Sequence, residues 1–500
     1  MVAKQIEEPP ATLDEVPTVL TAAFPFVPGR VTLAHVASTY LPADVTRRFW
    51  TVLGERVSLI SATDVHSVQA SEDGKTRRHT EERCDAAHLA YRAAFAALGI
   101  EFDVYERTDH PAHVAHVQGV LSGLHKRNLL HRAKRWVTRC ANCLAYPPPR
   151  LTGRQDGPPR CPFCGSGALE EVESGHWFFR LEPHRNAVHR FAENQVQNDV
   201  RGWISSALRE PLRDWNITRD NVVGLPLSFA SPHQSLYLWV ESLIAYVSFG
   251  VQVREPPLRF AHFIGKNILL QHCVMWPVLA ECGLPEVEWA KISARGFLDL
   301  NGSDPELVEI DEALARVPPD YLRFWLTLLV PDKQVDFRFK REELRIASNS
   351  ILCHRVGNLL RRATIALHQG DHLGRTTDLD DPLCRRFWDE TVPAIRAEIS
   401  RLRPRAAAQA AMAYLSHLTR EFAARELYGA PSAERNGLLA FMIASALTVL
   451  SPIVPTLAAE YGVFEGWTPG SVSDIARAVA RPLAGTGAIW SPLSAWNEAG

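Results

Sequence analysis

The stretch that decides the fold is Val19-Leu-Thr-Ala-Ala-Phe-Pro-Phe26, followed by a helical pattern over Leu33–Leu53 and then by Val57-Ser-Leu-Ile-Ser-Ala62. The two apolar segments predict strands, and Pro28-Gly29 predicts the turn between the first strand and the helix. A strand, a helix and a second strand in this order begin a parallel α/β sheet.

The alternation of helices and strands continues along the chain. A helical stretch at Glu82–Leu98 is followed by a strand near Phe102–Tyr105, and strand-like segments return at Leu236–Val240 and Leu258–Ile264. From about Glu342 to Arg481 the sequence changes to helical patterns rich in Ala, Arg and Leu, with prolines mostly at turns. This change predicts a helix bundle appended to the α/β domain.

Two Cys-x-x-Cys pairs interrupt the α/β region, with 17 residues between Cys140-Ala-Asn-Cys143 and Cys161-Pro-Phe-Cys164. This spacing is typical of a zinc knuckle, in which each pair binds one side of the ion. Four thiolates complete a tetrahedron and leave no position for a substrate. We therefore expect a structural Zn²⁺ at Cys140, Cys143, Cys161 and Cys164; the alternative is a set of unconnected cysteines.

The composition limits the class and the location of the protein. A chain of 500 residues with 46% hydrophobic residues can build a large core, and its length predicts about three domains. The formal net charge of -2 gives no general attraction to nucleic acid. The nine cysteines leave an odd, scattered remainder outside the two pairs, which suits a reducing cytoplasm. The acidic start lacks the apolar region of a signal peptide, so we expect a cytoplasmic location.

One segment could cross a membrane by composition alone. Gly437–Ala459 carries no charge over 23 residues. However, Pro452 and Pro455 interrupt it, and apolar residues at helical spacing precede it. We therefore expect a buried helix of the bundle and no membrane partner.

Five ordered segments resemble the methionyl-tRNA synthetases, which are class I aminoacyl-tRNA synthetases, within about Val19 to Trp490. The segments are Thr21–Gly29, Ala62–His66, Arg213–Asp220, Tyr237–Glu241 and His262–Asn267.

The resemblance implies an α/β fold: a class I synthetase Rossmann-like parallel sheet, a zinc-knuckle insertion and a C-terminal α-helical bundle like an anticodon-binding domain. The implied parts are a flexible leader (1–17), the first half of the catalytic domain (18–125), the insertion (126–205), the second half of the catalytic domain (206–341), the bundle (342–485) and a tail (486–500).

Both ATP signatures of the family are altered in this chain. The first, His-x-Gly-His at a helix N-terminus, reads Thr32-Leu33-Ala34-His35, so His35 is kept and Thr32 can still donate one hydrogen bond. The second, Lys-Met-Ser-Lys-Ser, should follow Asn301-Gly302, where the chain instead reads Ser303-Asp-Pro-Glu-Leu-Val-Glu309. Two phosphate-binding lysines are lost, each typically worth about 1.5–3 kcal/mol, which should slow adenylation.

Lys266 is the candidate for a remaining phosphate or ribose contact, beside Asn267, where the family has an acidic residue. The resemblance thus implies ATP with Mg²⁺ as substrate, bound by Thr32, His35, Lys266 and Asn267, with the first three as catalytic residues. Two other replacements for the lost lysines stay open. They are Lys291, in Lys291-Ile-Ser-Ala-Arg295, and Arg295 itself.

The amino-acid side resembles the family more closely. Asp64 occupies the position whose carboxylate binds the substrate ammonium, and a buried anion needs such a cation. The resemblance places the amino-acid side chain among Phe24, Trp239, Tyr246, His272 and Trp276. Taken singly, such aromatic residues are more often plain core. Four residues depart from the family: Phe24 replaces leucine, Phe26 tyrosine, Ser242 alanine and Leu243 proline. Phe24 should reshape the cavity, so the identity of the amino acid stays open.

The bundle also departs from the family. Ser348–Arg361 resembles the opening helix of the anticodon domain, with Gly357 and Asn358 retained, but Ser432 stands where a tryptophan stacks on an anticodon base. Since such stacking is worth about 1–3 kcal/mol, ordinary recognition of the methionine anticodon is not expected. The alternative role of the bundle is to bury the flank of the catalytic domain.

Three functions remain open. The favoured one is a repurposed aminoacyl ligase or transferase of specialised metabolism. It would bind an amino acid and ATP, form an aminoacyl adenylate, and pass the acyl group to a small nucleophilic acceptor or carrier with the help of a partner enzyme. An N-hydroxylated amine in hydrazine formation is one such acceptor. The other two are a non-catalytic amino-acid-binding paralogue and a true methionine–tRNA ligase.

Overall fold

The fold is organised around one parallel sheet. The computed structural model describes residues 16–27, 29–66, 77–142, 159–161, 165–220, 224–232, 234–299, 309–376, 378 and 380–460. Within these residues, five strands follow the order β10-β9-β1-β2-β3, and every adjacent pair is parallel. Their bounds are β1 Val19–Ala22, β2 Ser58–Thr63, β3 Val104–Arg107, β9 Leu258–Gly265 and β10 Val287–Arg295. The predicted α/β class with a parallel sheet is confirmed.

The strand order reverses beside β1. Strands β2 and β3, which follow β1 in the sequence, lie on one side of it. Strands β9 and β10, which come much later in the sequence, lie on the other side. In open α/β sheets, ligands bind outside the carboxyl ends of the strands at such a reversal. Phe24, Asp64 and Lys266 follow the ends of β1, β2 and β9 within two residues. The topology alone therefore brings these three candidates to one edge of the sheet.

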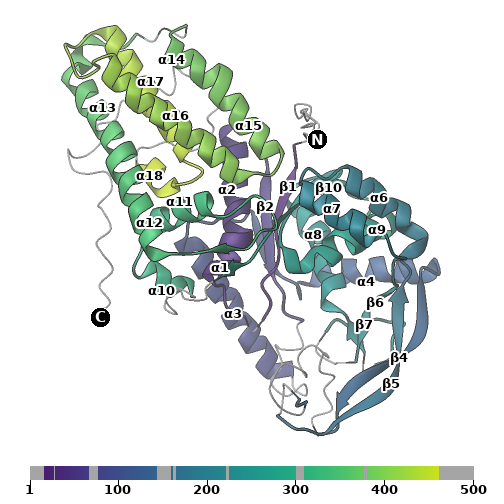
Figure 1. Cartoon of the computed structure of the whole chain (residues 1–500). Coiled ribbons are helices and arrows are strands. Elements are labelled where there is room, and N and C mark those ends of the chain that lie inside the picture. Colours follow the sequence, from purple (N-terminus) through teal and green to yellow (C-terminus); the bar gives the residue numbers. More distant parts are fainter. Residues whose placement is uncertain are drawn as a thin grey trace, which may run out of the picture.

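Helices cover both faces of the sheet (Figure 1). A continuous helical run connects β1 to β2, formed by α1 (Leu33–His35), η2 (Val36–Tyr40) and α2 (Leu41–Val52). The other face is covered by α4 (Pro111–Lys126) and α8 (Leu238–Val253). Neighbouring residues of β1 pack into different cores, Leu20 with α2 and Val19 with α4 and α8, because side chains alternate along a strand.

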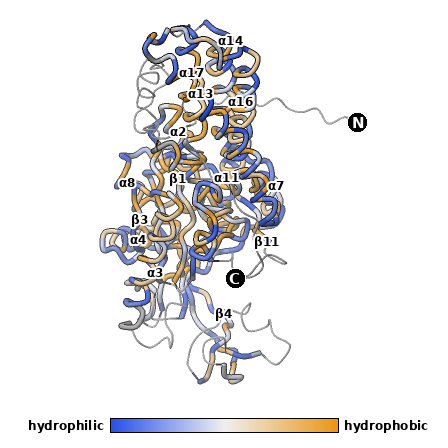
Figure 2. Tube along the Cα trace, turned by 90° about the vertical axis from the view of Figure 1, so that its left-hand side faces the viewer, coloured by the Kyte–Doolittle hydropathy of each residue, from blue (hydrophilic) through white to orange (hydrophobic). Residues whose placement is uncertain are grey.

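A long hairpin carries the predicted insertion. Its strands, β4 (Leu130–Cys140) and β5 (Leu169–Phe179), pair antiparallel along their whole length. The hairpin extends away from the sheet at the lower end of the molecule in Figures 1 and 2. Cys140 is the last residue of β4, so the first predicted zinc ligand lies at the far end of the hairpin.

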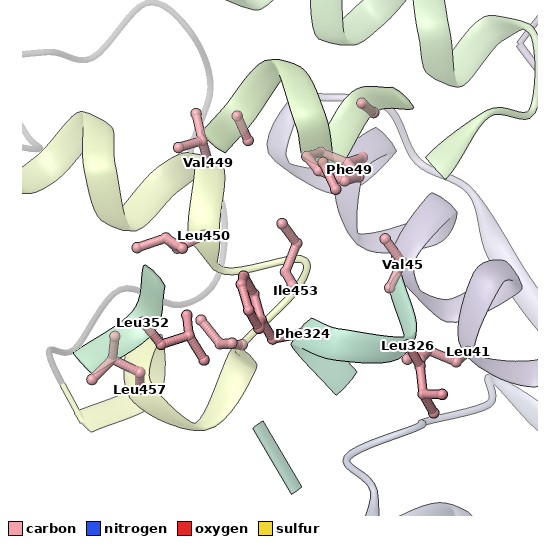
Figure 3. Close-up of a cluster of buried hydrophobic side chains, with 14 of the residues drawn as sticks. Leu41, Val45, Phe49, Phe324, Leu326, Leu352, Val449, Leu450, Ile453 and Leu457 are labelled. Carbon is pink, nitrogen blue, oxygen red and sulfur yellow. The ribbon is translucent and has the colours of Figure 1, made fainter. Parts of the chain in front are cut away.

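The C-terminal part of the described chain is a helix bundle, as the sequence predicts. Its helices are α12 (Arg341–Ala347), η8 (Ser348–Gly357), α13 (Asn358–Gln369), α14 (Pro382–Arg385), η10 (Arg386–Thr391), α15 (Val392–Ser400), α16 (Pro404–Ala424), α17 (Ala433–Leu450) and α18 (Pro455–Glu460). Figure 3 shows how the bundle joins the sheet domain. Phe49 of α2, Phe324 of α11 (Pro319–Leu329), Leu352 of η8 and Leu450 of α17 belong to one buried cluster. The bundle therefore buries the flank of the sheet domain.

One described helix, α17, is long and apolar enough to cross a membrane, and 83% of its apolar window is buried inside this protein. The helix begins at Ala433 and contains the first part of the uncharged stretch Gly437–Ala459, up to Leu450. It packs as the expected core helix of the bundle.

Two predicted strands were wrong in part. The segment Leu236–Val240 is not a strand, because β8 covers only Ser235–Leu236 and α8 begins at Leu238. That helix is buried from Val240 to Gly250 without interruption. Its apolar run therefore lacks the helical period that would distinguish it from a buried strand. The first strand also stops at Ala22 and not at Phe26, ahead of Pro25.

Candidate active site

The first ATP signature forms the start of the helical run after β1. Thr32 is the N-cap of α1, and the His35 backbone N–H donates to Thr32 Oγ1 over 3.5 Å. In return, the Thr32 backbone N–H donates to His35 Nδ1 over 3.2 Å. Desolvation lowers the pKa of His35, against a hydrogen bond with the Arg30 backbone that raises it. The imidazole is therefore neutral and turned back on its own helix end, where it satisfies one of the first backbone donors.

The last residue of the segment that replaces the second signature lies beside the first signature. Thr32 and Glu309 form an isolated antiparallel bridge, and Arg30 Nη1 lies 3.8 Å from Glu309 Oε2. The intervening segment, from Asn301 and Gly302 through Val308, lies outside the described residues. Glu309 thus places a carboxylate next to the start of α1. In the family, the corresponding segment carries lysines instead.

Lys266 is placed at the expected edge of the sheet but is already paired. Its Nζ lies 2.7 Å from the Asp336 carboxylate and 4.9 Å from the centre of the Phe297 ring. Asp336 also accepts the Phe297 backbone N–H over 2.7 Å. A hydrogen bond from Lys266 is the largest of the influences that lower the pKa of Asp336. Asn267 follows in the short helix η5 (Lys266–Ile268). A phosphate group at Lys266 would have to compete with Asp336.

The two other candidate cations are in the interior. Arg295 is 1% exposed, donates to Ser293 Oγ over 2.9 Å and pairs with Asp332 over 3.3 Å. It is therefore committed to the junction with the bundle and does not replace a lost lysine. Lys291 is buried on β10, where its Nζ lies 5.0 Å from the centre of the Trp289 ring.

Asp64 lies at the end of β2 and is 3% exposed. Its Oδ2 lies 2.5 Å from Ser242 Oγ, at hydrogen-bond distance, and Thr108 Oγ1 lies 3.5 Å from Oδ1. Backbone bonds fix it in place, since the Asp64 N–H donates to the Pro25 carbonyl and its own carbonyl accepts from Val27. Burial, followed by the charge of Glu241, raises the pKa of Asp64 to about 7. A buried carboxylate in this state favours a ligand that brings a positive charge.

A second buried carboxylate, Glu241, lies in the first turn of α8 and was missed by the sequence analysis. His66 Nδ1 donates to its Oε1 over 2.6 Å, and His113 Nε2 lies 3.7 Å from the same oxygen. Burial alone would raise the pKa of Glu241, but His66 and His113 outweigh it and lower that pKa. Burial likewise opposes charge on His66, and Glu241 more than compensates and raises its pKa. The positive charge of His66 is therefore compensated mainly by Glu241. Asp64 has no comparably close cation among the described residues and could pair with a cationic ligand.

The predicted aromatic residues gather on the same side of the sheet. The Phe24 and Tyr246 rings meet edge to face at 4.9 Å, and Tyr246 lies 6.0 Å from Trp276. His272 Nδ1 lies 3.0 Å from the Ile268 carbonyl, which can only accept. His272 Nε2 therefore accepts from the Tyr246 hydroxyl, 3.0 Å away.

Burial lowers the pKa of His272 to about 4, so this ring is neutral. The charge of Asp64 acts on Tyr246 and adds to the effect of burial in raising its pKa, so the anchor and the aromatic cluster are neighbours. Trp239 is half-buried in the first turn of α8.

His262 joins this cluster and was not singled out in the sequence. Its ring lies 4.7 Å from Tyr246 and 4.8 Å from Trp276, and its Nδ1 is 2.7 Å from Thr21 Oγ1. Burial lowers the pKa of His262 well below its ordinary value. The signal that could have found it is a histidine in the middle of the largely apolar strand Leu258–Ile264, since a buried polar ring needs a partner.

The zinc ligands are described only in part. Cys143 and Cys164 lie outside the described residues, while Cys140 and Cys161 are both buried. The Ala141 N–H donates to Ala168 and the Cys161 N–H donates to Ser166, so both cysteines are tied to the same end of the hairpin. Gly165, with φ of 71°, closes a turn by donating to the Cys161 carbonyl. No group of three or more metal ligands occurs among the described residues. The two thiols fit the predicted site, which stays a prediction.

A helix-capping serine occupies the position at which the family has its tryptophan. Ser432 is the N-cap of α17, and its hydroxyl accepts the Arg435 N–H over 3.1 Å. Serine is favoured at such a position because its short side chain reaches the unpaired donors of the helix start. Asn358, retained from the family pattern, donates to the His354 carbonyl of its own helical run.

Comparison with known proteins agrees with this architecture. The family model described as tRNA synthetases class I (M) matches residues 18–170 and 154–364. The methionine–tRNA ligase of Methanobrevibacter smithii is 28% identical over 396 residues, which are 70% of this chain and 59% of the relative. That of Methanocaldococcus jannaschii is 27% identical over 403 residues, with the same coverage of 70% and 59%. The chain thus spans 59% of the length of these relatives.

A solved structure shares the fold. Mycobacterium tuberculosis methionyl-tRNA synthetase bound by methionyl-adenylate aligns with a TM-score of 0.74 and 20% identity, covering 94% of this chain and 97% of that one. Because the family model also covers well over half of the sequence, the protein belongs to the M family of class I tRNA synthetases.

Proposed function

We propose that this protein is an aminoacyl ligase or transferase that activates an amino acid with ATP and transfers the acyl group to an acceptor other than initiator tRNA. The observation that carries the proposal is the contrast between the two ends of the site. Asp64 is a buried carboxylate whose neighbouring cation, His66, is bound by Glu241. Lys266, in contrast, is paired with Asp336.

The chemistry would proceed in two steps. A carboxylate oxygen of the amino acid attacks the α-phosphorus of ATP, and pyrophosphate leaves. A nucleophilic acceptor then attacks the acyl carbon, and AMP leaves. Asp64 would hold the ammonium group, while Thr32, His35, Lys266 and Asn267 would face the nucleotide, with Mg²⁺ arriving with ATP. An N-hydroxylated amine is a suitable acceptor because its oxygen is a good nucleophile, and a partner enzyme would then form the N–N bond.

A second candidate is methionine–tRNA ligase, and the relatives favour it because those compared above, and further archaeal relatives of 25–27% identity, carry that name. The Mycobacterium tuberculosis structure that shares the fold holds methionyl-adenylate. Against it stands Ser432, which caps a helix where the family places its base-stacking tryptophan.

The test is amino-acid-dependent exchange of pyrophosphate into ATP, followed by charging of initiator tRNA. Exchange without charging supports the proposal, and charging at ordinary rates supports the tRNA ligase. Amino-acid binding without exchange would overturn both in favour of a binding protein. Asp64→Ala should weaken amino-acid binding on the order of a hundredfold or more, because it removes the partner of a buried cation. Glu255→Ala, which removes an exposed carboxylate of the same domain, is the matched control. Unchanged binding in Asp64→Ala would mean that the ammonium site is elsewhere.

A further inference from the structure

Ser242 stands between two acceptors. Its Oγ lies 2.5 Å from Asp64 Oδ2 and 2.9 Å from the Leu238 carbonyl oxygen. A hydroxyl has one hydrogen and can donate it to only one of them at a time. If it donates to Leu238, the short contact with Asp64 requires a hydrogen on the carboxyl group. If it donates to Asp64, the carboxyl group can be ionised. The geometry therefore accommodates both protonation states of Asp64 without moving a heavy atom.

The groups around Asp64 favour the neutral acid before a ligand arrives. From α8 it faces Glu241 and Tyr246, and Glu241 is a fully buried anion. From the segment after β2 it faces His66, whose ring nitrogen is held by Glu241 at 2.6 Å.

The segment after β3 and the helix α4 add little positive charge near Asp64. Thr108 approaches Asp64, and Asp109, which pairs with Arg107, acts on His66. His113 of α4 faces Glu241. The loop after β1 brings Pro25 and Phe26, which carry no charge. Burial and Glu241 together raise the pKa of Asp64 to about 7 although Ser242 works in the opposite direction.

We propose that Ser242 makes the amine site a proton-exchanging site, in which neutral Asp64 releases a proton as an ammonium group binds and the Ser242 hydroxyl turns from Leu238 to the new carboxylate. The inference rests on the proposed function, because it concerns the amine of the same substrate. In this step, the carboxylic acid of Asp64 and the ammonium ion of the ligand form an ion pair, and one proton passes to the solvent. The site thereby selects a free primary amine, since an acylated nitrogen brings no charge to keep Asp64 ionised.

The first test is calorimetry of L-methionine, and of any other amino acid that supports exchange, in two buffers of different ionisation enthalpy. We expect about half a proton to be released per amino acid near pH 7, and nearly none near pH 8.5. Removing the Ser242 hydroxyl should raise the titration midpoint of Asp64 by about one pH unit. Ser242→Ala should then weaken binding about fivefold near pH 7 but only about 1.3-fold near pH 8.5.

Two variants separate this role from a structural one. Ser242→Thr keeps a hydroxyl and should retain the pH profile of the wild type. Ser61→Ala removes another buried hydroxyl, which donates to the Ala22 carbonyl, and should change neither proton release nor the profile. Equal loss of affinity at both pH values in Ser242→Ala would overturn the inference, as would binding without proton release.

The second test needs no ligand. Infrared spectroscopy of the free protein should show a protonated carboxyl band that titrates near pH 7, disappears in Asp64→Asn and titrates at higher pH in Ser242→Ala. Absence of this band at pH 6 would overturn the inference even if amino acids bind. A carboxyl band that titrates near pH 7, together with no binding of any amino acid, would support the two protonation states of Asp64 but overturn both the exchange with an amine and the proposed function.

Discussion

Replacing Asp44 by asparagine should loosen the junction between the sheet domain and the bundle. Asp44 of α2 and Arg323 of α11 are both fully buried, and Arg323 Nη2 lies 2.7 Å from Asp44 Oδ2. Arg323 also donates to the carbonyls of Leu98, Pro452 and Ile453, so it ties the end of helix α3 (Arg77–Ala97) to the turn after α17. Asp44→Asn keeps the shape of the side chain but removes the negative charge that this guanidinium needs.

The size of the loss follows from the electrostatics of Asp44. Burial raises its pKa, but Arg48, Arg323 and Arg47 outweigh burial and lower it from 3.8 to about 2. This difference corresponds to about 2.4 kcal/mol of preference for the ionised form in the folded protein. Removal of one partner from a buried ion pair typically costs about 3–5 kcal/mol. We therefore expect Asp44→Asn to lose about 2–4 kcal/mol of unfolding free energy near pH 7.

The assay is urea unfolding followed by tryptophan fluorescence, with Glu101→Gln as the control. Glu101 lies 3.9 Å from Arg47, and its side chain is 75% exposed, so its loss should cost under about 0.5 kcal/mol. Because the pKa of Asp44 is depressed in the folded state, its contribution is complete above about pH 4 and disappears as the pH falls toward 2. The gap between wild type and Asp44→Asn should be constant from pH 7 to 5 and shrink below pH 4. Equal stability of the two proteins at pH 7 would refute the reasoning.

Two further substitutions test other parts of the structure. Gly296→Ala would place a Cβ 2.2 Å from the Val335 carbonyl oxygen and should cost about 3 kcal/mol or more in urea unfolding. Gly202→Ala, which meets nothing within 4 Å on a helix, should instead be stabilising by about 0.5–1 kcal/mol. Cys161→Ser should reduce zinc measured by mass spectrometry from about one ion per chain to none, whereas Cys84→Ser should not change it. A wild-type protein without zinc would rule out the knuckle.

The sheet was predictable because its signals are local. The strands Leu258–Gly265 and Ser58–Thr63 are short apolar runs bounded by turns, and the helix between β1 and β2 shows its period in the sequence. The helix α8 was not predictable in this way. Its buried surface extends around the helix, so neither a period of two nor a period of 3.6 is visible in the run.

The site was predictable only where it follows the ends of strands. Asp64 and Lys266 directly follow β2 and β9. In open α/β sheets, ligands usually bind at this end of the strands. The pair His66 and Glu241 was missed because 175 residues separate its members. One hint was available, since a glutamate within an apolar buried stretch must find a cation or a proton. Which of the two it finds depends on packing that the sequence does not display.

The two ends of the site differ in how their charges are compensated, and this difference constrains the chemistry. At the end proposed for the nucleotide, Lys266 is paired with Asp336 at 2.7 Å and Arg30 lies 3.8 Å from Glu309. Both pairs are partly exposed, so each contributes little and can exchange with a ligand at small cost. At the end proposed for the amine, Asp64 is buried, and its ionised form would be compensated fully only by a cation that the ligand brings. Under the proposed function, the amino acid would therefore gain more from the protein than the triphosphate would, and neutralisation of the triphosphate would come chiefly from the metal ion that accompanies it.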